Sequence, residues 1–535
     1  SDTNIAIGVN ALRKHNLTTT GDAYNVAVGD SAGTEMTTGI YNVLIGGLAG
    51  DALTSGNNNV AVGLHALGGD TKGDQSVAIG NDALKDQNFT TNTDVYNVAV
   101  GKSAGQSVTT GKLNTLIGAF AGDALTDADD NIALGYGALT SDTLGSRSVA
   151  IGRDALFDQN FTTATNAYNV AVGYSAGANV TTGIRNNFLG GLAGFATTSG
   201  SKNVAIGLSA LEGNTVGSRS IAIGNNSLGV QNPSTATDMY NVAIGDHAGN
   251  DITTGERNVL VGGQAGDALT SADFNTALGH AALSADTQGE RSVAIGYFSL
   301  VSQNRTTASQ SNNTAVGFQS GANVTTGNDN VLIGSDAGDG MTTAHSCTIV
   351  GFSCSASAFN GTNQIVIGDA INGDSNGTFT FGSSAGQVHN HFGTDATWTR
   401  TSDERLKKNI TDTDLGLSFI NDLRTVKYNW KGHHELDTSD KQLEHLFQNK
   451  DGSNKTEADN EMETDVTMHG FIAQEVKAAL DTAGVDDWAG WEEDRFGVQR
   501  ISREMFVIPL VKAVQELSTQ VTTLQAEIEK LKSGG

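Results

Sequence analysis

The chain has 535 residues, with 31 Lys and Arg against 58 Asp and Glu, which gives a formal net charge of -27 at pH 7. This acidic excess disfavours capture of nucleic acid or of an anionic membrane surface. Glycine is abundant at 67 residues while proline occurs only twice, which fits neither a collagen-like chain nor a Pro-rich disordered one. No apolar stretch approaches the ~20 residues of a membrane helix, so we expect no membrane insertion.

A strict superrepeat organises the first two thirds of the chain. The segment YNVAVG begins at Tyr24 and again at Tyr96, and the spacing of 72 residues then recurs along the chain. Within each superrepeat a shorter unit ends in glycine after 17, 17, 17 and 21 residues, and this register runs from Gly8 to Gly368 over 21 glycines. A short fixed period indicates a solenoid, in which each unit stacks on its neighbours.

Each unit reads N/S-V-A-V/I-G, which predicts a short β-strand. The period of two in a strand separates the β-branched residues from the alanine and glycine. We expect valine and isoleucine to fill the interior of each coil, and the Ala/Gly face to pack against other chains, most simply in a homotrimer. The repeated T-T-G or T-S-G, as at Gly39 and Gly56, predicts a turn with positive φ.

These units resemble the left-handed parallel β-rolls in the heads of trimeric autotransporter adhesins, and repeat arrays in phage tail fibres. The resemblance covers about residues 4–370. It implies a mainly β fold, a trimeric solenoid of about 21 coils over residues 1–370. Coils of 17 and 21 residues are longer than the usual head units, so no adhesin ligand is carried over. Residues 371–400 are expected to form a β connector.

The remaining residues, 401–535, differ in composition and contain three of the four tryptophans. Four segments resemble the intramolecular chaperone domain of endosialidase-type tailspikes and many phage fibres: TSDERLKKNI at 401–410, NDLRTVKYNWK at 421–431, HGFIAQEV at 469–476 and IPLVKAVQEL at 508–517. The resemblance implies a small α+β domain that acts as a trimerisation chaperone.

In that family the domain can cut itself off by means of a Ser/Lys dyad. The matching positions are Ser402 and Lys407, with the bond between Thr401 and Ser402 as the one broken. A serine hydroxyl needs a base to become a nucleophile, and a lysine serves as that base only if burial lowers its pKa toward neutrality. An alternative interpretation of the same residues is an ordinary helix start, with Ser402 or Asp403 as the N-cap.

The C-terminal residues predict a long helix over about 503–532. Apolar residues alternate in steps of four and three, which is the seam of a coiled coil; they are Leu510, Val514, Leu517, Val521, Leu524, Ile528 and Leu531. β-Branched residues at a with leucine at d favour two strands, which disagrees with the trimer. Residues 433–466 are polar and predict a solvated insertion.

His389 and His391 stand two apart in a predicted strand, so both imidazoles point to one face. The segment resembles the His-x-His metal pairs of some phage fibre shafts. In a trimer it would place six imidazoles on the axis, where an octahedral transition metal could bind. The alternative is a pair of packed or surface histidines without a metal.

Together these features predict a structural and attachment protein, extracellular, on a virion tail or a cell-surface appendage. It would bind an unknown receptor, glycan or protein, and no nucleic acid. Autoproteolysis is the only enzymatic activity expected. The alternative is a tailspike glycan depolymerase, which would need paired carboxylates and aromatic rings in a groove.

Overall fold

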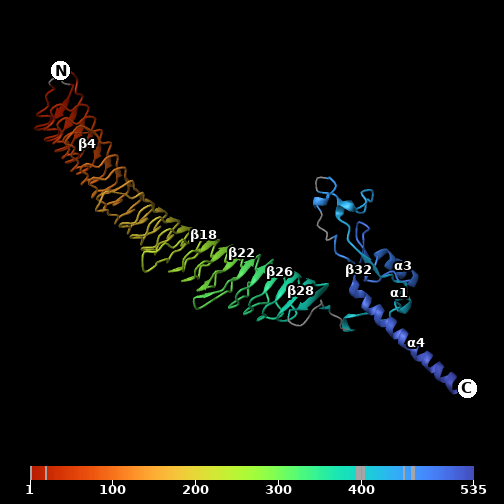
Figure 1. The fold of residues 1–535 in the computed structure, drawn as a ribbon. Coiled ribbons are helices and arrows are strands. Elements are labelled where there is room, and N and C mark those ends of the chain that lie inside the picture. Colours follow the sequence, from red (N-terminus) through yellow and green to blue (C-terminus); the bar gives the residue numbers. More distant parts are fainter. Residues whose placement is uncertain are drawn as a thin grey trace. The chain divides into compact units, whose positions relative to one another are not determined.

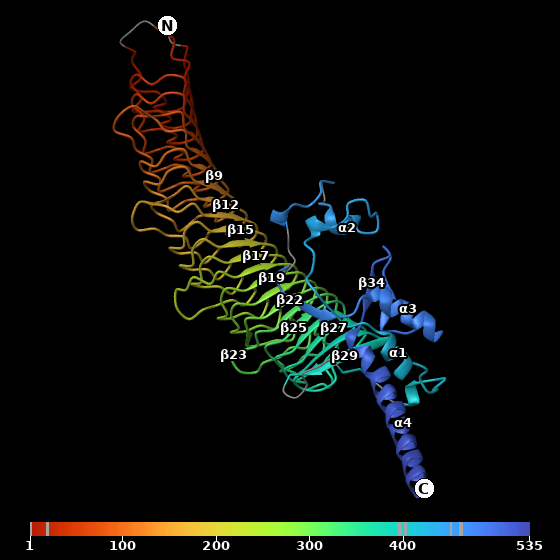
Figure 2. The same cartoon turned by 45° about the vertical axis from the view of Figure 1, so that its right-hand side comes forward.

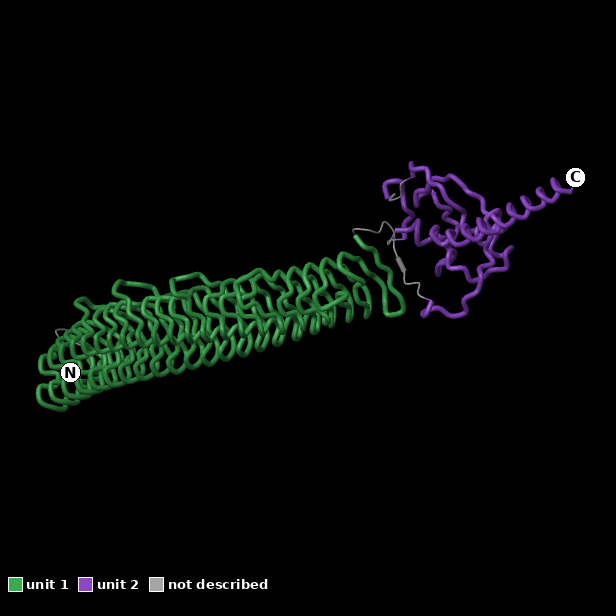
Figure 3. Tube along the Cα trace, turned by 90° about the horizontal axis from the view of Figure 1, so that it is seen from below, with its two compact units in different colours: residues 1–401 green, residues 402–535 purple. Residues whose placement is uncertain are grey.

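The structure is a computed structural model that describes residues 3–17, 21–392, 399–400, 404–449, 452–459 and 464–534. The chain divides into two compact units, Ser1–Thr401 and Ser402–Gly535 (Figure 3). Each unit is described by itself below.

The first unit is a β-solenoid of about 22 turns (Figure 1). Each rung contributes one short strand, and successive strands pair in parallel and in register. The rung strands are β1 (Ile5–Ile7), β2 (Val26–Val28), β3 (Val43–Ile45), β4 (Val60–Val62), β6 (Val77–Ile79), β8 (Val98–Val100), β9 (Thr115–Ile117), β10 (Ile132–Leu134), β12 (Val149–Ile151), β14 (Val170–Val172), β15 (Asn187–Leu189), β16 (Val204–Ile206), β17 (Ile221–Ile223), β18 (Val242–Ile244), β19 (Val259–Val261), β20 (Thr276–Leu278), β22 (Val293–Ile295), β24 (Thr314–Val316), β25 (Val331–Ile333), β26 (Thr348–Phe352) and β27 (Ile365–Asp369).

The longer coils project as loops on one side of the solenoid (Figure 2). In three of them two-residue strands pair in parallel at the base of the loop. These strands are β5 (Gly73–Asp74) with β7 (Thr93–Asp94), β11 (Gly145–Ser146) with β13 (Thr165–Asn166), and β21 (Gly289–Glu290) with β23 (Ser309–Gln310).

Side chains alternate along each rung strand in the opposite sense to the sequence expectation. The central alanine, such as Ala27 or Ala61, is fully buried inside its own coil, while the flanking valines and isoleucines lie outside. Ile79, for example, keeps 38% of its surface exposed in the single chain. We call this outer surface the Val/Ile face. The prediction that the Ala/Gly face needs another chain was therefore wrong, and the Val/Ile face is the one left without cover.

The reason lies in the narrow interior of the coil, where large side chains come from the opposite wall. At most rungs the central residue is alanine, and the wall position holds a leucine such as Leu67, which is buried in the same core cluster as Ala61. In β3 the central residue is Leu44, and the wall positions beside it are Gly33 and Gly50. A Cβ at either glycine would lie 2.8 Å from a Leu44 methyl carbon. A small residue on the strand is thus matched by a large one on the opposite wall, and a large one by glycine, which keeps the interior volume nearly constant.

The expected positive φ also falls elsewhere. It occurs at the rung glycines from Gly8 to Gly351, where φ lies between +131° and +143°. At Gly39, in the T-T-G segment, glycine is required for another reason: a Cβ there would lie 2.5 Å from the carbonyl oxygen of Gly56 in the next coil. Close approach of two backbones, rather than a left-handed turn, explains this glycine.

A buried column of amides precedes the rung strands. The backbone N–H of Asn42 donates to Asn25 Oδ1 at 2.9 Å, and the backbone N–H of Asn59 donates to Asn42 Oδ1 at 2.9 Å. The Asn42 amide also donates to the carbonyl oxygen of Gly56 at 2.9 Å. Since buried polar groups are costly unless they are bonded, these ladders select one register of stacking.

The long coil interrupts the asparagine column, and a glutamine restores it. Gln87 Nε2 donates to Ser76 Oγ at 3.0 Å, and Gln87 Oε1 accepts from Asn97 Nδ2 at 2.9 Å. The same Gln87 Nε2 lies 2.6 Å from Asp70 Oδ2. Equivalent bonds link Ser148, Gln159 and Asn169 one superrepeat later, so the insertion is built into the polar column.

Asp142 repeats the role of Asp70 in the second superrepeat. Its carboxylate accepts from Gln159 Nε2 at 2.6 Å and from the backbone N–H groups of Gly145 at 3.0 Å and Phe161 at 3.1 Å. Burial raises the pKa of Asp142, although these donors oppose the shift. In the third superrepeat Asn214 holds the same place, and its Nδ2 donates to the carbonyl oxygen of Gly217 at 2.9 Å.

We expect Asp142→Asn to strengthen its coil at neutral pH. Because the folded pKa of Asp142 is raised, the carboxyl favours the folded state below its unfolded pKa of about 3.9, and this contribution is lost as the pH rises through the folded pKa. The asparagine side chain does not ionise, so the variant does not lose this stability as the pH rises. Amide hydrogen exchange at Gly145 and Phe161, compared between variant and wild type, should show added protection at pH 7 and little change at pH 4. The reverse variant, Asn214→Asp, should lose protection at Gly217 at pH 7. Weaker protection of Asp142→Asn at both pH values would contradict the expectation.

Residues 371–400 extend the solenoid and then close it. β28 (Thr378–Ser383) continues the parallel stack on β27, β29 (Gly386–His391) returns antiparallel to β28, and β30 (Thr399–Arg400) pairs antiparallel with β29. A parallel stack exposes an open strand edge at its end. The reversal of direction covers that edge.

The second unit is a small α+β domain. Its elements are η1 (Glu404–Leu406), α1 (Leu417–Asp422), β31 (Val426–Tyr428), η2 (His433–Glu435), α2 (Glu444–Phe447), η3 (Glu457–Asp459), β32 (Met468–Gly470), α3 (Ala473–Ala483), β33 (Trp491–Glu493), β34 (Gln499–Ile501), η4 (Arg503–Phe506) and α4 (Val507–Ser533). Its core packs Phe419 of α1 against Trp488 and Phe506, with Val476 and Leu480 of α3 beneath. The predicted insertion contains η2, α2 and η3, so it is more ordered than a plain loop.

The C-terminal helix matches its prediction, since η4 leads directly into α4. α4 is fixed at its start by burial of Pro509 and Ala513 and by α1, where the backbone N–H of Leu417 donates to Glu516 Oε2 at 2.8 Å. No helix in the described parts of the chain has the length and apolar character needed to cross a membrane.

Candidate functional site

The coiled-coil seam of α4 is uncovered in the single chain. All seven of its apolar residues are exposed, Leu517 by 49% and Leu524 by 56%. Leucine side chains in water lose roughly 1.5–3 kcal/mol each compared with burial. A row of seven on one helix, in heptad register, therefore marks a surface made for other helices.

The Val/Ile face of the solenoid is a second uncovered apolar surface. It runs along the rung strands, and residues such as Ile132, Leu189 and Ile333 are between 40% and 49% exposed. Monomeric soluble proteins rarely expose contiguous apolar patches of this kind. Both units thus present apolar surfaces that a single chain leaves in water.

The predicted dyad lies only partly within the described residues. Thr401 and Ser402 fall outside them, so their geometry is not described. Lys407 follows η1, its side chain is exposed in the single chain, and its backbone N–H donates to the carbonyl oxygen of Glu404 at 3.0 Å. The dyad remains a prediction.

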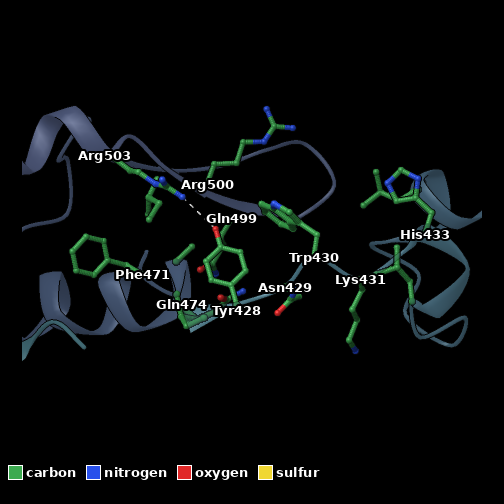
Figure 4. Close-up of a pocket in the computed structure, with 15 residues that line it drawn as sticks. Tyr428, Asn429, Trp430, Lys431, His433, Phe471, Gln474, Gln499, Arg500 and Arg503 are labelled. Carbon is green, nitrogen blue, oxygen red and sulfur yellow. Dashed lines mark hydrogen bonds between the residues drawn. The ribbon is translucent and has the colours of Figure 1, made fainter. Parts of the chain in front are cut away.

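A cavity of about 750 Å³ lies in the second unit (Figure 4). Tyr428 and Trp430 meet edge to face, with ring centres 5.3 Å apart, and Arg503 Nη2 donates to Tyr428 Oη at 3.3 Å. Phe471 and Arg500 also line the cavity, and Arg500 pairs with Asp494 at 2.9 Å. Aromatic rings beside guanidinium groups can hold an apolar segment that carries a carboxylate.

Sequence reasoning missed this cavity although it used the segments that build it. Tyr428 and Trp430 belong to the segment 421–431, and Phe471 belongs to 469–476. The antiparallel pairing of β31 with β32 brings these segments together across about forty residues of sequence. No local spacing reveals that contact. The signal available in the sequence was the presence of aromatic residues in both segments.

The strand register places His389 and His391 on the inner side of the sheet. His389 lies opposite Thr380 and His391 opposite Thr378, and both threonines are buried. Side chains of directly opposite residues share a face. His389 Nε2 also lies 3.8 Å from Asp374 Oδ1. The pair therefore points away from the Val/Ile face, and metal binding remains a prediction.

Comparison with known proteins identifies the second unit. Residues 402–485 match the family described as chaperone of endosialidase. No curated protein matches the chain. The match begins at the residue where the second compact unit begins. The second unit therefore carries a chaperone domain of the endosialidase type, which this chain joins to a β-solenoid of about 22 turns.

Proposed function

We propose that the chain is a segment of a homotrimeric fibre that attaches to a cell surface, on a virion tail or a cell-surface appendage. The chaperone family implies trimer formation. The observation that carries the proposal is the pair of uncovered apolar surfaces, the Val/Ile face on the first unit and the α4 seam on the second. A trimer covers both at once. Three copies of a weak receptor site then bind with avidity, which suits attachment.

We further propose that the chaperone unit releases itself after assembly. Ser402 Oγ attacks the carbonyl carbon of Thr401 while Lys407 Nζ takes the hydroxyl proton. Lys407 then gives this proton to the Ser402 nitrogen as the peptide C–N bond breaks and the ester forms. Water then hydrolyses the ester, which leaves a carboxylate on Thr401 and a free amine on Ser402. Lys407 is exposed in the single chain, so the burial that a lysine base requires would come from neighbouring chains. Cleavage would then follow assembly.

Denaturing mass analysis tests this release. Wild type should yield a C-terminal fragment that begins at Ser402, while Ser402→Ala should stay whole because it lacks the nucleophile. Ser418→Ala, at an exposed serine of α1, is the matched control and should cleave. Lys407→Ala should stay whole, whereas Lys408→Ala should cleave. Identical intact masses for wild type and Ser402→Ala would reject self-cleavage and leave the chaperone role standing.

The depolymerase alternative finds little support in the grooves of the solenoid. One groove of about 280 Å³ near its C-terminal end carries two carboxylates, Asp336 and Asp339. The other residues that line it are small or polar, such as Ser353 and Asn372, and include no aromatic ring. A reducing-sugar assay on capsular polysaccharide tests the alternative directly, and released sugar would favour it.

The predicted metal site at the histidine pair would need more than one chain. His389 and His391 supply two imidazoles per chain, so the remaining ligands would come from other copies or from water. The inward direction of the pair does not fit an axis bordered by the Val/Ile faces. Elemental analysis of the purified fibre should therefore find less than one transition metal per trimer, in wild type and in His389→Ala alike. One metal per trimer, lost in His389→Ala, would contradict this and support the axial site.

A further inference from the structure

One outer column of the solenoid differs in charge from the rest of the chain. It consists of the residue five positions before each rung glycine, and every member from Tyr24 to Asn363 has a positive φ near 55°. Backbone hydrogen bonds stack these residues rung upon rung; the N–H of Arg185 donates to the carbonyl oxygen of Ala167 at 2.8 Å, and the N–H of Lys202 donates to that of Ile184 at 2.9 Å. Their side chains therefore follow one another at the strand spacing of about 4.8 Å.

Nine successive members of this column include six cations, three aromatic residues and no acid. We call them the basic column: Arg147, Tyr168, Arg185, Lys202, Arg219, Tyr240, Arg257, Phe274 and Arg291. The first 392 residues contain fourteen Lys and Arg, so six of fourteen stand in these nine positions. All nine side chains are exposed in the single chain.

Cations and rings contact one another along the column. The guanidinium group of Arg147 lies 5.7 Å from the Tyr168 ring centre, and its Nη1 donates to Tyr168 Oη at 2.9 Å. The guanidinium group of Arg219 lies 5.4 Å from the Tyr240 ring centre. These contacts hold guanidinium groups of the column against neighbouring rings.

Folding alone does not explain the middle of the column. Arg185, Lys202 and Arg219 occupy three successive rungs, each two residues before its rung strand, and like charges this close repel one another. Arg219 is paired with Asp238 at 2.9 Å. Arg185 and Lys202 have no carboxylate within ion-pair distance among the described residues. An external anion would offset this repulsion.

We infer that the basic column binds an acidic polysaccharide lengthwise. Six cations over eight rung spacings give about one cation per 6 Å, broken by neutral rings. Arg147, Arg219 and Arg257 also pair with Asp130, Asp238 and Glu256. That density suits a polysaccharide with carboxylates on some of its sugars, whereas duplex DNA carries one charge per about 1.7 Å and would meet the acidic remainder of the chain. Arginine binds carboxylates by paired hydrogen bonds, and the rings give sugars an apolar contact. The inference rests on the attachment role proposed above and gives it a ligand class.

The test uses the full chain with three substitutions, Arg185→Asn, Lys202→Asn and Arg219→Asn. Asparagine already occupies this column at Asn58 and Asn312, with the same positive φ, so the backbone accepts it. The control makes the same change of charge at Lys85, Lys102 and Lys112, whose rung positions elsewhere hold Asn250, Asn81 and Asn57. The probes are polygalacturonate, neutral dextran and a single-stranded oligonucleotide.

Wild type and control should bind polygalacturonate more tightly than dextran. The column variant should bind it roughly a hundredfold more weakly, since each of the three cations removed contributes about fivefold near an anionic surface. All three proteins should keep the same native mass and melting temperature. If the column variant and the control lost the same affinity for polygalacturonate, the inference would be overturned, because the change in net charge would then explain both losses. Failure of only the column variant to assemble would overturn it too, by assigning the column to contacts between chains. Tighter binding of the oligonucleotide, or no binding by wild type, would also overturn it. Attachment to host cells that persists in the column variant would overturn the column site and leave the attachment role intact.

Discussion

Replacing Leu517 and Leu524 by aspartate should prevent assembly of the chain into trimers. Both leucines are about half exposed on α4 in the single chain and lie in its heptad seam. Burial of each leucine side chain contributes about 2 kcal/mol to the stability of the helical bundle. Removing two leucines from each of three chains therefore costs on the order of 10 kcal/mol. Six new carboxylates would also repel one another in the seam. Light scattering should find single chains or aggregates in place of trimers.

The control for this experiment lies on the same helix. Ser518→Asp with Gln525→Asp introduces the same charges at the same spacing, on exposed positions outside the seam. These chains should still assemble. The background should carry Ser402→Ala, so that the helix stays attached. Trimers of normal mass from the Leu517 and Leu524 variant would show that the solenoid assembles without the seam.

Gly152→Ala should disrupt the solenoid around β12 and β14. A Cβ at Gly152 would lie 2.4 Å from the carbonyl oxygen of Gly173 and 2.7 Å from its carbonyl carbon, and φ at Gly152 is +131°. Neither backbone can yield without breaking the stack, so overpacking and strain together should cost about 4 kcal/mol. Hydrogen exchange should show lost protection at the amides of both strands, and protease should cut there first.

Gly191→Ala provides the matched control, two rungs farther along the solenoid. A Cβ at Gly191 would meet only a methyl carbon of Leu208, at 3.4 Å. Its stability should stay within about 0.5 kcal/mol of wild type. If Gly152→Ala kept the protection and protease resistance of Gly191→Ala, the close stacking of rung glycines would be wrong.

Much of the fold could be read from the spacing of residues. The glycine register located the rungs, because each coil must bring its glycine against the next one, as Gly152 meets Gly173. The heptad pattern located α4, because the apolar residues of a coiled-coil seam repeat in steps of four and three residues. Both features depend on intervals along the chain, which the sequence displays.

The direction of the rung side chains could not be read in the same way. Alternation separates Val26 and Val28 from Ala27, but it does not say which side is the interior. That depends on what the opposite wall contributes, such as Gly50 beside Leu44. The sequence does contain the matching of large wall residues with small strand residues. That matching can be recognised only when it is known which positions face each other across the coil.

The candidate site was predictable only where a family motif marks it. The resemblance of 401–410 placed Ser402 and Lys407, and the family match at 402–485 supports the domain without testing the dyad. The cavity lined by Tyr428 and Phe471 depends on the pairing of distant strands. The basic column depends on a register of 17 and 21 residues that separates its members along the chain.

The central claim is that other copies of the chain cover the Val/Ile face and the α4 seam. Native mass spectrometry of the Ser402→Ala protein, which keeps both units together, tests it most directly. The account predicts one species of three chains, at three times 55.2 kDa. A stable, monodisperse species at 55.2 kDa would contradict it, because both apolar surfaces would then face water.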